Sequence, residues 1–533
     1  MPDGDVNAHR RIPRPAWDVI NQLALRRCTD ETHSVRFRRG SEITRWTLAE
    51  LDQRAVNLAR RLHATGVRVA DRVGVLSTNR IEWVLLDLAV LKLGGVTVAV
   101  EPGRFEPERV VEKYGLRRLF AEGETSRDAV QDIDSVLPLT EPPGNDVPEL
   151  PAFAGYDEAD ICQIKQTSGS TGTPRGIETT AVSVNSSISE VQELFRHGDG
   201  DNILVLLPLW FLQQRWWFYS ALVFGHDVAL SGYEDAVEMA QAVSPSVVMG
   251  VPRLYDDLRA RIRASGAPVD LPERRETIQA LLGGRIRYLW TGSAPATRAT
   301  LEFFNDAEVP LYEGYGLNET CIVAKNHPGA FRLGSVGQVL PNKTIRFDRD
   351  GVLVIASHHP VNTRYTWCNP GDNQKVWLPT GEIKTYDLGH VDDDGFLWIH
   401  GRVDDVISPS AGPNVLLPPI ETLLRGLPGV HECAAYGRAV RFLTAIVSPT
   451  PDLDPAVLSD RIVALNETLR PEQRIHAVIV AAEQFSVRNG LLNTQFKLKR
   501  RQIEERFARE LELVYDKHNG DAAPPVPPVL VFG

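Results

Sequence analysis

Hydroxyl, glycine and basic residues are concentrated in one short segment, residues 167–176, which reads TSGSTGTPRG. Glycines let backbone N–H groups turn toward an anion, the hydroxyls add further donors, and Arg175 supplies a cation. The segment lacks the GxxxxGK pattern of a Walker A loop. It therefore predicts a phosphate-binding loop of another type, with a polar surface loop as the alternative.

Three further unusual segments follow in chain order: YEGYGLNET at 312–320, TYDLGHVDDDGFLWIHGR at 385–402 and NGLLNTQFKLKR at 489–500. Together with the loop they resemble the motifs of the adenylate-forming superfamily of acyl-CoA synthetases, peptide adenylation domains and luciferases. The loop matches that family's TSGTTGxPKG, and the later segments match its YGxTE, TGDLG…GR and lysine-bearing terminal motifs. MGVPRLYDDL and GSAPATRATLEFF narrow the resemblance toward the long-chain acyl-CoA synthetase branch.

The resemblance implies binding of ATP with Mg²⁺, and release of pyrophosphate when an acid oxygen attacks the α-phosphate. The β- and γ-phosphates would be held by Thr167, Ser168, Gly169, Ser170, Thr171, Gly172 and Arg175. Arg175 stands where the family usually has lysine, and its guanidinium adds a bidentate fork. Glu319 would hold Mg²⁺, for which a carboxylate is a preferred ligand.

The resemblance also assigns the nucleoside half of ATP. Tyr315 would stack on adenine, and the opposite wall would be the turn made of Gly292, Ser293, Ala294 and Pro295. Asp387 would accept the ribose hydroxyls, and Arg402 would support the ribose and phosphate end. Glu313 and Gly316, which flank Tyr315, are assigned to the same nucleotide site.

Lys497 aligns with the family lysine that reaches the α-phosphate and the acid oxygen during adenylation; Lys499 is the alternative. Asn318 replaces the usual threonine beside the α-phosphate and the acid. In the family a small C-terminal domain rotates about a hinge, and Asp404 in GRVDDVI matches that position. The rotation would carry Lys497 out of the site before thioester formation.

Several residues depart from the family pattern. Tyr386 replaces the glycine of TGD and adds bulk near Asp387, and the tripeptide at 493–495 replaces Thr-Pro-Thr. In LPLWFLQQRWW, Phe211 and Gln214 replace a histidine and a glutamate near the acyl pocket. The aromatic residues of this segment are predicted to be core rather than pocket: Trp210, Phe211, Trp216, Trp217 and Phe218.

The organisation of the chain fits an enzyme of two or more domains. Helical periodicity at 47–66 and 81–94 alternates with strand-like runs at 71–77, 96–102, 246–252 and 285–295, which predicts an α/β domain with mostly parallel sheets. Shorter strands after GRVDDVI predict a small α+β domain. The predicted division is 1–402 for ATP and acid binding, 403–520 for a mobile C-terminal domain, and 521–533 for a proline-rich tail or edge extension.

The composition excludes several function classes. A net charge of −11 argues against a nucleic-acid partner. Five scattered cysteines, an N-terminus without a signal-like apolar core and the lack of a spanning apolar run predict a cytoplasmic protein without integral membrane association.

The sequence thus predicts an AMP-forming ligase that adenylates a small or medium acid and passes it to a nucleophile, most simply CoA. Two alternatives remain. One is a natural-product diazotase that activates nitrite for attack by an aromatic amine, and the other is a non-catalytic ATP-binding relative. A carrier-protein acceptor also remains open.

Overall fold

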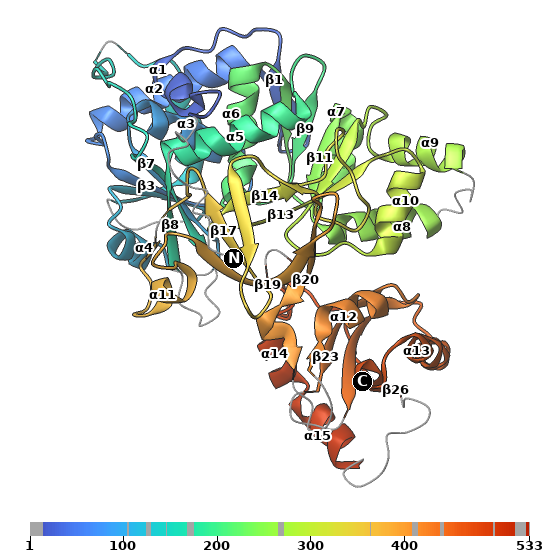
Figure 1. Ribbon diagram of the computed structural model, residues 1–533. Helices are drawn as coiled ribbons and strands as arrows, with labels where there is room; N and C mark the ends of the chain where they lie inside the picture. The colour runs from blue at the N-terminus through green and yellow to red at the C-terminus, as the bar shows by residue number, and fades with distance from the viewer. Residues whose placement is uncertain are drawn as a thin grey trace.

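The computed structural model describes residues 14–103, 106–123, 129–144, 146–167, 175–264, 271–362, 364–407, 414–437, 442–493, 496–517 and 529–531. A large α/β part precedes a smaller part that begins after the β19–β20 region and lies beside it (Figure 1). The predicted α/β class with mostly parallel sheets is confirmed.

The largest sheet has nine strands in the described residues, with its central strands parallel. Across the sheet they are β15 (Gln338–Val339), β14 (Cys321–Lys325), β13 (Leu311–Leu317), β12 (Tyr288–Thr291), β11 (Val247–Gly250), β9 (Asn202–Val205), β10 (Asp227–Leu230), β1 (Ser34–Arg39) and β2 (Glu42–Thr47). The edge strands β2, β14 and β15 pair antiparallel.

The second sheet has seven described strands and is parallel from β7 to β6. Its order is β18 (Tyr365–Thr366), β8 (Arg175–Thr180), β7 (Ile161–Thr167), β4 (Val96–Val100), β3 (Arg72–Leu76), β5 (Arg118–Ala121) and β6 (Val130–Asp132). Strand β8 returns antiparallel beside β7, so the two strands flank the predicted phosphate loop.

Five helices share one hydrophobic core with strands of both large sheets: α1 (Val19–Leu25), α2 (Leu48–Ala64), α3 (Ile81–Lys92), α5 (Ala181–Phe195) and α6 (Leu212–Phe224). Helix α2 begins after Thr47, which forms a capping box with Glu50, and it confirms the predicted amphipathic helix. Helix α3 is buried on every side, as its predominantly apolar sequence predicts.

The other helices of the large part lie over its sheets and edges. They are α4 (Pro107–Tyr114), α7 (Ala236–Val243), α8 (Pro252–Ala264), α9 (Leu271–Leu281), α10 (Arg298–Asp306) and α11 (Asp372–Val376).

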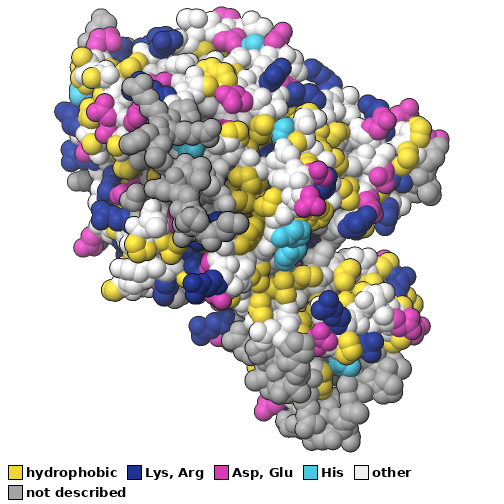
Figure 2. Space-filling view, viewed as in Figure 1, with side chains coloured by type: hydrophobic (Ala, Val, Ile, Leu, Met, Phe, Trp, Pro, Cys, Tyr) yellow, Lys and Arg dark blue, Asp and Glu magenta, His cyan; other side chains and the backbone are white. Residues whose placement is uncertain are grey.

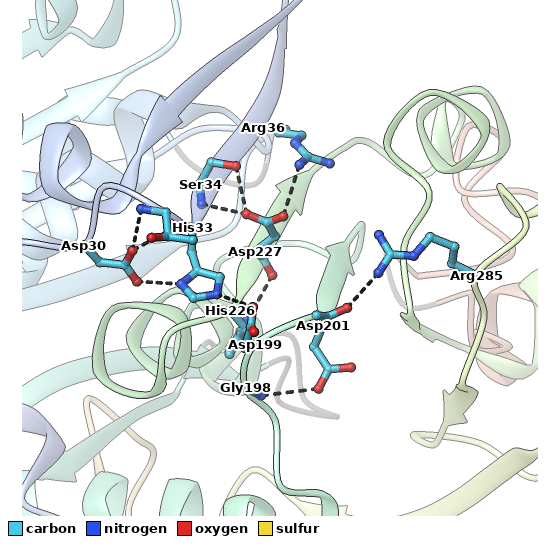
Figure 3. Close-up of polar contacts among 12 residues, drawn as sticks. Asp30, His33, Ser34, Arg36, Gly198, Asp199, Asp201, His226, Asp227 and Arg285 are labelled. Carbon is cyan, nitrogen blue, oxygen red and sulfur yellow. Dashed lines mark hydrogen bonds and ion pairs between the residues drawn. The ribbon is translucent and has the colours of Figure 1, made fainter.

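A partly buried ion pair joins the first strand of the chain to β10 (Figure 3). Asp227 accepts hydrogen bonds from the Ser34 backbone N–H at 2.7 Å and from its hydroxyl at 2.8 Å, and Arg36 donates to it at 3.0 Å. His33 contacts Asp30 at 2.7 Å beside this pair. The Asp227 contacts join β1 to β10 within the large sheet.

A four-stranded antiparallel sheet connects the two parts, with strands β16 (Lys343–Phe347), β17 (Val352–Ser357), β19 (Ile383–Val391) and β20 (Leu397–Arg402). The short turn η3 (Val403–Asp405) and the pair β21 (Val406–Ile407) and β22 (Val415–Leu416) follow.

The small part has its own four-stranded sheet and its own hydrophobic clusters. Its strands are β23 (Val430–Tyr436), β24 (Leu443–Pro449), β25 (Ile475–Val480) and β26 (Val529–Val531), and its helices are α12 (Leu417–Arg425), α13 (Pro455–Thr468), α14 (Arg500–Arg506) and α15 (Ala508–Lys517). Strand β26 comes from the proline-rich end of the chain and pairs parallel with β25.

The surface carries both signs of charge. On the face seen in Figure 2, Lys and Arg side chains are interspersed with Asp and Glu and do not gather into one basic patch. In the part of the chain that the structure describes, each helix is too short or too polar to cross a membrane.

Candidate functional site

One cavity of about 550 Å³ lies where the carboxyl ends of β7, β11, β12 and β13 meet. Strands β19 and β20 and the segment before α14 close its other side, so both parts of the molecule contribute to it. In open α/β sheets this edge is where ligands usually bind, because adjacent strand ends leave a crevice there.

The cavity wall is strongly cationic. Six basic side chains line it, against the carboxylates of Glu319 and Asp404; the six are Lys165, Arg175, Lys375, Lys384, Arg402 and Lys497. Such an excess of positive charge suits a polyanionic ligand, since clefts lined by one sign of charge concentrate ligands of the opposite sign.

The two strands that flank the predicted phosphate loop reach this cavity, because Lys165 of β7 and Arg175 of β8 line it. Thr167 ends β7 and pairs in register with Arg175, which begins β8. The intervening predicted binding residues lie outside the described residues; they are Ser168, Gly169, Ser170, Thr171 and Gly172. Arg175 lines the cavity, forms an ion pair with Asp372 at 3.0 Å and stands 5.0 Å from the Tyr365 ring.

The predicted adenine pocket is only partly assembled from the expected residues. Gly292, Ser293, Tyr315 and Gly316 line the cavity, whereas Ala294, Pro295 and Glu313 are not among its lining residues. Ser293 has a φ of +71°, in the left-handed region that costs a non-glycine residue about 1–2 kcal/mol.

Glu313 is buried behind that turn. Its carboxylate accepts a hydrogen bond from the Ala296 N–H at 3.3 Å, and burial raises its pKa to about 7. Glu313 therefore supports the 292–295 turn from behind.

The predicted ribose ligand, Asp387, is 4% exposed and already engaged in hydrogen bonds. Its carboxylate accepts a hydrogen bond from the Tyr315 hydroxyl and another from Arg402 at 3.3 Å. Burial raises the pKa of Asp387, while Arg402 opposes that rise. Tyr315, Asp387 and Arg402 thus form one connected group at the nucleoside end.

Asn318 and Glu319 occupy the turn between β13 and β14 and line the cavity. The Tyr365 hydroxyl donates to Glu319, and the Lys165 ammonium donates to the Asn318 side-chain oxygen. Lys165 is the functional candidate that sequence reasoning missed. The sequence feature that could have identified it is a lysine within a strand whose other residues are mostly buried, because Lys is almost never buried without a partner.

Lys497 reaches the cavity from the segment before α14. Its backbone is held by Asn493, whose side-chain oxygen accepts its N–H at 3.0 Å. The cavity walls lower the pKa of the Lys497 ammonium, and Arg402 acts in the same direction. The fallback candidate, Lys499, is not a lining residue and precedes α14 as its N-cap.

Phe496 joins the two parts beside Lys497. Its ring centroid lies 4.6 Å from that of Tyr233, and Phe496 packs against hydrophobic clusters of both parts. The observed arrangement therefore places Lys497 in the cavity and holds it there through an aromatic contact.

The residues that depart from the family pattern surround the same cavity. Phe211 and Gln214 line it, and Phe211 also packs against a hydrophobic core cluster, so its side chain belongs to both the core and the cavity wall. Phe211 is the N-cap residue of α6, where the chain turns toward the cavity, whereas Trp216, Trp217 and Phe218 are buried as predicted. Trp210 is half-buried against the core.

Tyr386 also lines the cavity and has a φ of +63°. Its hydroxyl donates to the Lys375 carbonyl at 2.7 Å, which ties β19 to α11. Glycine adopts this backbone conformation without strain.

Comparison with known proteins finds a family model and several CoA ligases that are similar to this chain. The family model described as AMP-binding enzyme matches residues 22–354. Long-chain-fatty-acid–CoA ligase FadD15 of Mycobacterium bovis is 28% identical, with 88% of this chain and 92% of the relative covered. The 2-succinylbenzoate–CoA ligase of Bacillus subtilis is 25% identical, with 73% of this chain and 80% of the relative covered.

Solved structures share the fold. The o-succinylbenzoate CoA synthetase of Bacillus subtilis in complex with its acyl-adenylate intermediate superposes with a TM-score of 0.73 at 21% identity, covering 91% of this chain and 98% of that one. The anthranilate CoA ligase AuaEII in complex with anthranoyl-AMP gives a TM-score of 0.73 at 18% identity, covering 92% and 96%.

Proposed function

Because the chain belongs to the AMP-binding enzyme family, we propose that it is an ATP-dependent, AMP-forming ligase that adenylates a small or medium carboxylic acid and transfers the acyl group to CoA. The observation that carries the proposal is the cationic cavity, into which Lys497 extends from the small part. A cavity that gathers six cations at the ends of parallel strands fits a nucleoside triphosphate together with an acid.

In the proposed reaction, a carboxylate oxygen of the acid bonds to the α-phosphorus of ATP, and the bond to the bridging oxygen of pyrophosphate breaks. Lys497 neutralises charge on the acid and α-phosphate oxygens, and Asn318 positions the acid. Arg175 and the 167–172 loop hold the leaving pyrophosphate. Catalysis of this kind depends chiefly on positioning and charge neutralisation.

At the nucleoside end, Tyr315 and Gly316 face the 292–295 turn across the cavity, and Asp387 and Arg402 take the ribose. Tyr315 and Arg402 already donate hydrogen bonds to the Asp387 carboxylate. A bound ribose hydroxyl must therefore either replace the Tyr315 hydrogen bond or share the carboxylate with it. Glu313 acts from behind as a positioning residue for the turn.

Glu319 is the carboxylate proposed to hold Mg²⁺. A single carboxylate beside a polyphosphate site fits this ion, which binds proteins through one or two carboxylates and completes its shell with phosphates and water. When bound, Mg²⁺ would neutralise phosphate charge. Tyr365 holds Glu319 through its hydroxyl.

Transfer to CoA requires Lys497 to leave. The CoA sulfur bonds to the acyl carbon, the bond between that carbon and the AMP phosphate oxygen breaks, and AMP departs while the thiol proton passes to water. We assign the movement to residues 403–520, with exposed Asp404 as the hinge position. Arg500 pairs with Asp405 at 3.1 Å and with Glu421 at 2.6 Å, so the segment just after the hinge would move with α12 and α14.

The named relatives favour a carboxylic acid and CoA over the nitrite and amine of the diazotase alternative, since their names specify fatty acids and 2-succinylbenzoate. The position of Lys497 in the cavity argues against a non-catalytic nucleotide binder, which needs no such group.

The test is acid-dependent release of pyrophosphate and AMP with ATP and Mg²⁺, across fatty acids, aryl acids, short dicarboxylic acids and nitrite, each with CoA or an arylamine. Lys497→Ala should abolish most acid-dependent pyrophosphate release, whereas the matched Lys499→Ala should retain it. Release only with nitrite plus amine, or ATP binding without any release, would refute the CoA-ligase proposal.

A further inference from the structure

A buried lysine lies at the acid end of the cavity. Lys165, near the end of β7, is 5% exposed, and its ammonium donates to the Asn318 side-chain oxygen. The ammonium also stands 5.0 Å from the ring centroid of Phe211. Among the described residues, no carboxylate lies within ion-pairing distance of it.

A buried charge of this kind is costly unless an opposite charge compensates it. An amide oxygen and an aromatic face supply only part of what water gives an ammonium. Burial lowers the pKa of Lys165 to about 8, so most of the lysine still carries its charge at pH 7. The ammonium therefore stays charged without a direct ion-pair partner among the described residues, although the nearby Glu319 carboxylate favours that charge.

A second polar side chain in the same wall has unused hydrogen-bonding capacity. Gln214 is 2% exposed and lines the cavity. Its amide nitrogen contacts the Met249 sulfur at 3.4 Å, while its amide oxygen is buried and has no hydrogen-bond partner among the described residues. An amide oxygen only accepts hydrogen bonds, so it can pair with a donor of the acid but not with an anionic oxygen, which leaves Lys165 rather than Gln214 to bind an anion.

A second, small cavity adjoins the main one at Trp290. Trp216, Trp217 and Trp290, each at most 5% exposed, line this cavity of about 30 Å³. One water molecule needs about 10–15 Å³ of such space, so the small cavity holds about two waters and is too small for an acyl chain.

We propose that Lys165 binds an anionic oxygen of the acid substrate, so that the pocket selects compact acids that place such an oxygen beside Lys165 over acids with medium or long apolar chains. The inference rests on the proposed function, because it concerns the acid that is adenylated. The second carboxylate of a short dicarboxylic acid supplies this chemistry.

The experiment compares acids of matched length and different charge: succinate with butyrate, and glutarate with pentanoate, alongside octanoate and nitrite. Acid-dependent pyrophosphate release gives kcat/KM for the wild type, Lys165→Met and Lys165→Arg. A charged hydrogen bond contributes about 1.5–3 kcal/mol, so Lys165→Met should lower kcat/KM for the preferred anion about 10- to 100-fold. Butyrate should change little, and Lys165→Arg should restore part of the loss through KM.

A second readout does not need catalysis. The preferred anion should raise the Tm of the wild-type protein in the presence of ATP and Mg²⁺, and this shift should disappear in Lys165→Met. A Lys165-dependent preference for the dicarboxylates supports the proposal, whereas release with nitrite alone refutes the proposed function on which it rests.

The proposal is overturned if octanoate is the best acid, or if the dicarboxylate-to-monocarboxylate ratio is the same in active Lys165→Met as in the wild type. No pyrophosphate release with any acid refutes the proposed function instead. In that case a Lys165-dependent Tm shift still supports anion binding, and its absence overturns it.

Discussion

Replacing Lys165 by methionine should stabilise the ligand-free protein. Methionine fills nearly the same volume and removes the buried ammonium. The pKa of Lys165 falls from 10.5 to about 8 in the folded protein. At 1.36 kcal/mol for each pKa unit, the buried charge costs about 3 kcal/mol of folding free energy when protonated. Screening and relaxation of the cavity lower this figure, so a gain of about 1–3 kcal/mol is expected.

The sign follows from proton linkage. Below pH 8 Lys165 is protonated in both folded and unfolded states, and the full penalty is present. Between pH 8 and 10.5 the unfolded state binds more protons, so the stability of the wild type rises with pH in this range. The advantage of Lys165→Met should therefore be largest at pH 7 and shrink toward pH 10.5.

Urea unfolding of wild type and Lys165→Met at pH 7 and pH 10 measures this directly. Lys499→Met, which changes a lysine outside the cavity, is the control and should alter stability by less than about 0.5 kcal/mol at either pH. A lower free energy of unfolding for Lys165→Met than for the wild type at pH 7 would refute the reasoning. It would mean that the ammonium stabilises the ligand-free fold.

Three further predictions follow from single contacts. Phe496→Ala removes the aromatic contact with Tyr233, which contributes about 1 kcal/mol, and should slow adenylation about fivefold. The rate of thioester formation from preformed acyl-adenylate should stay unchanged. An equal loss of rate in both half-reactions would contradict this prediction. Tyr386→Gly should be about 1 kcal/mol more stable to urea than Tyr386→Ala, because both lose the hydroxyl bond and only glycine accepts a φ of +63° without strain. For the preferred anion, kcat/KM should fall above about pH 8 as Lys165 loses its proton, and Lys165→Arg should move that fall to higher pH; an unmoved profile would assign it to another group. The other titratable or charged groups acting on Lys165 are Cys321, Glu319, Arg215 and Lys497.

The sequence predicts the scaffold well where local and tertiary preferences agree. Helix α2 has an apolar stripe and a capping box at Thr47, so its start and its buried face follow from the sequence. The apolar runs of β3, β4 and β11 are parallel strands buried on both faces, as their composition indicates.

Side-chain direction at the site is less predictable. The YEGYG motif brings Glu313 and Tyr315 to one strand, but only Tyr315 lines the cavity, because the Glu313 carboxylate turns under the 292–295 turn to meet Ala296. The aromatic segment around α6 is apolar on several faces, so periodicity alone cannot separate Phe211, which faces the cavity, from its buried neighbours.

The sequence pattern around Lys165 does not assign it to the acid site. Lys165 stands two residues before the phosphate loop, in the strand that leads into it. The strand that carries Lys165 pairs with β4 on one side and with β8 on the other, so it lies inside the sheet. A lysine is unusual in such a strand. Only the three-dimensional arrangement reveals that Asn318, from a distant segment, meets its ammonium.

The two lysines of the cavity differ in the property that their proposed tasks require. Lys497 extends into the cavity from a segment joined to the large part through Phe496, so a modest free energy is enough to release it when adenylation is complete. Lys165 is buried on a central strand of the sheet and cannot leave without breaking pairing with β4 and β8. A cation that can move away, such as Lys497, suits the negative charge that develops only during adenylation. A fixed cation, such as Lys165, suits a substrate group that is present in both adenylation and thioester formation. If Lys165 selects the acid, its influence should therefore appear equally in adenylation and thioester formation, while that of Lys497 should appear only in adenylation.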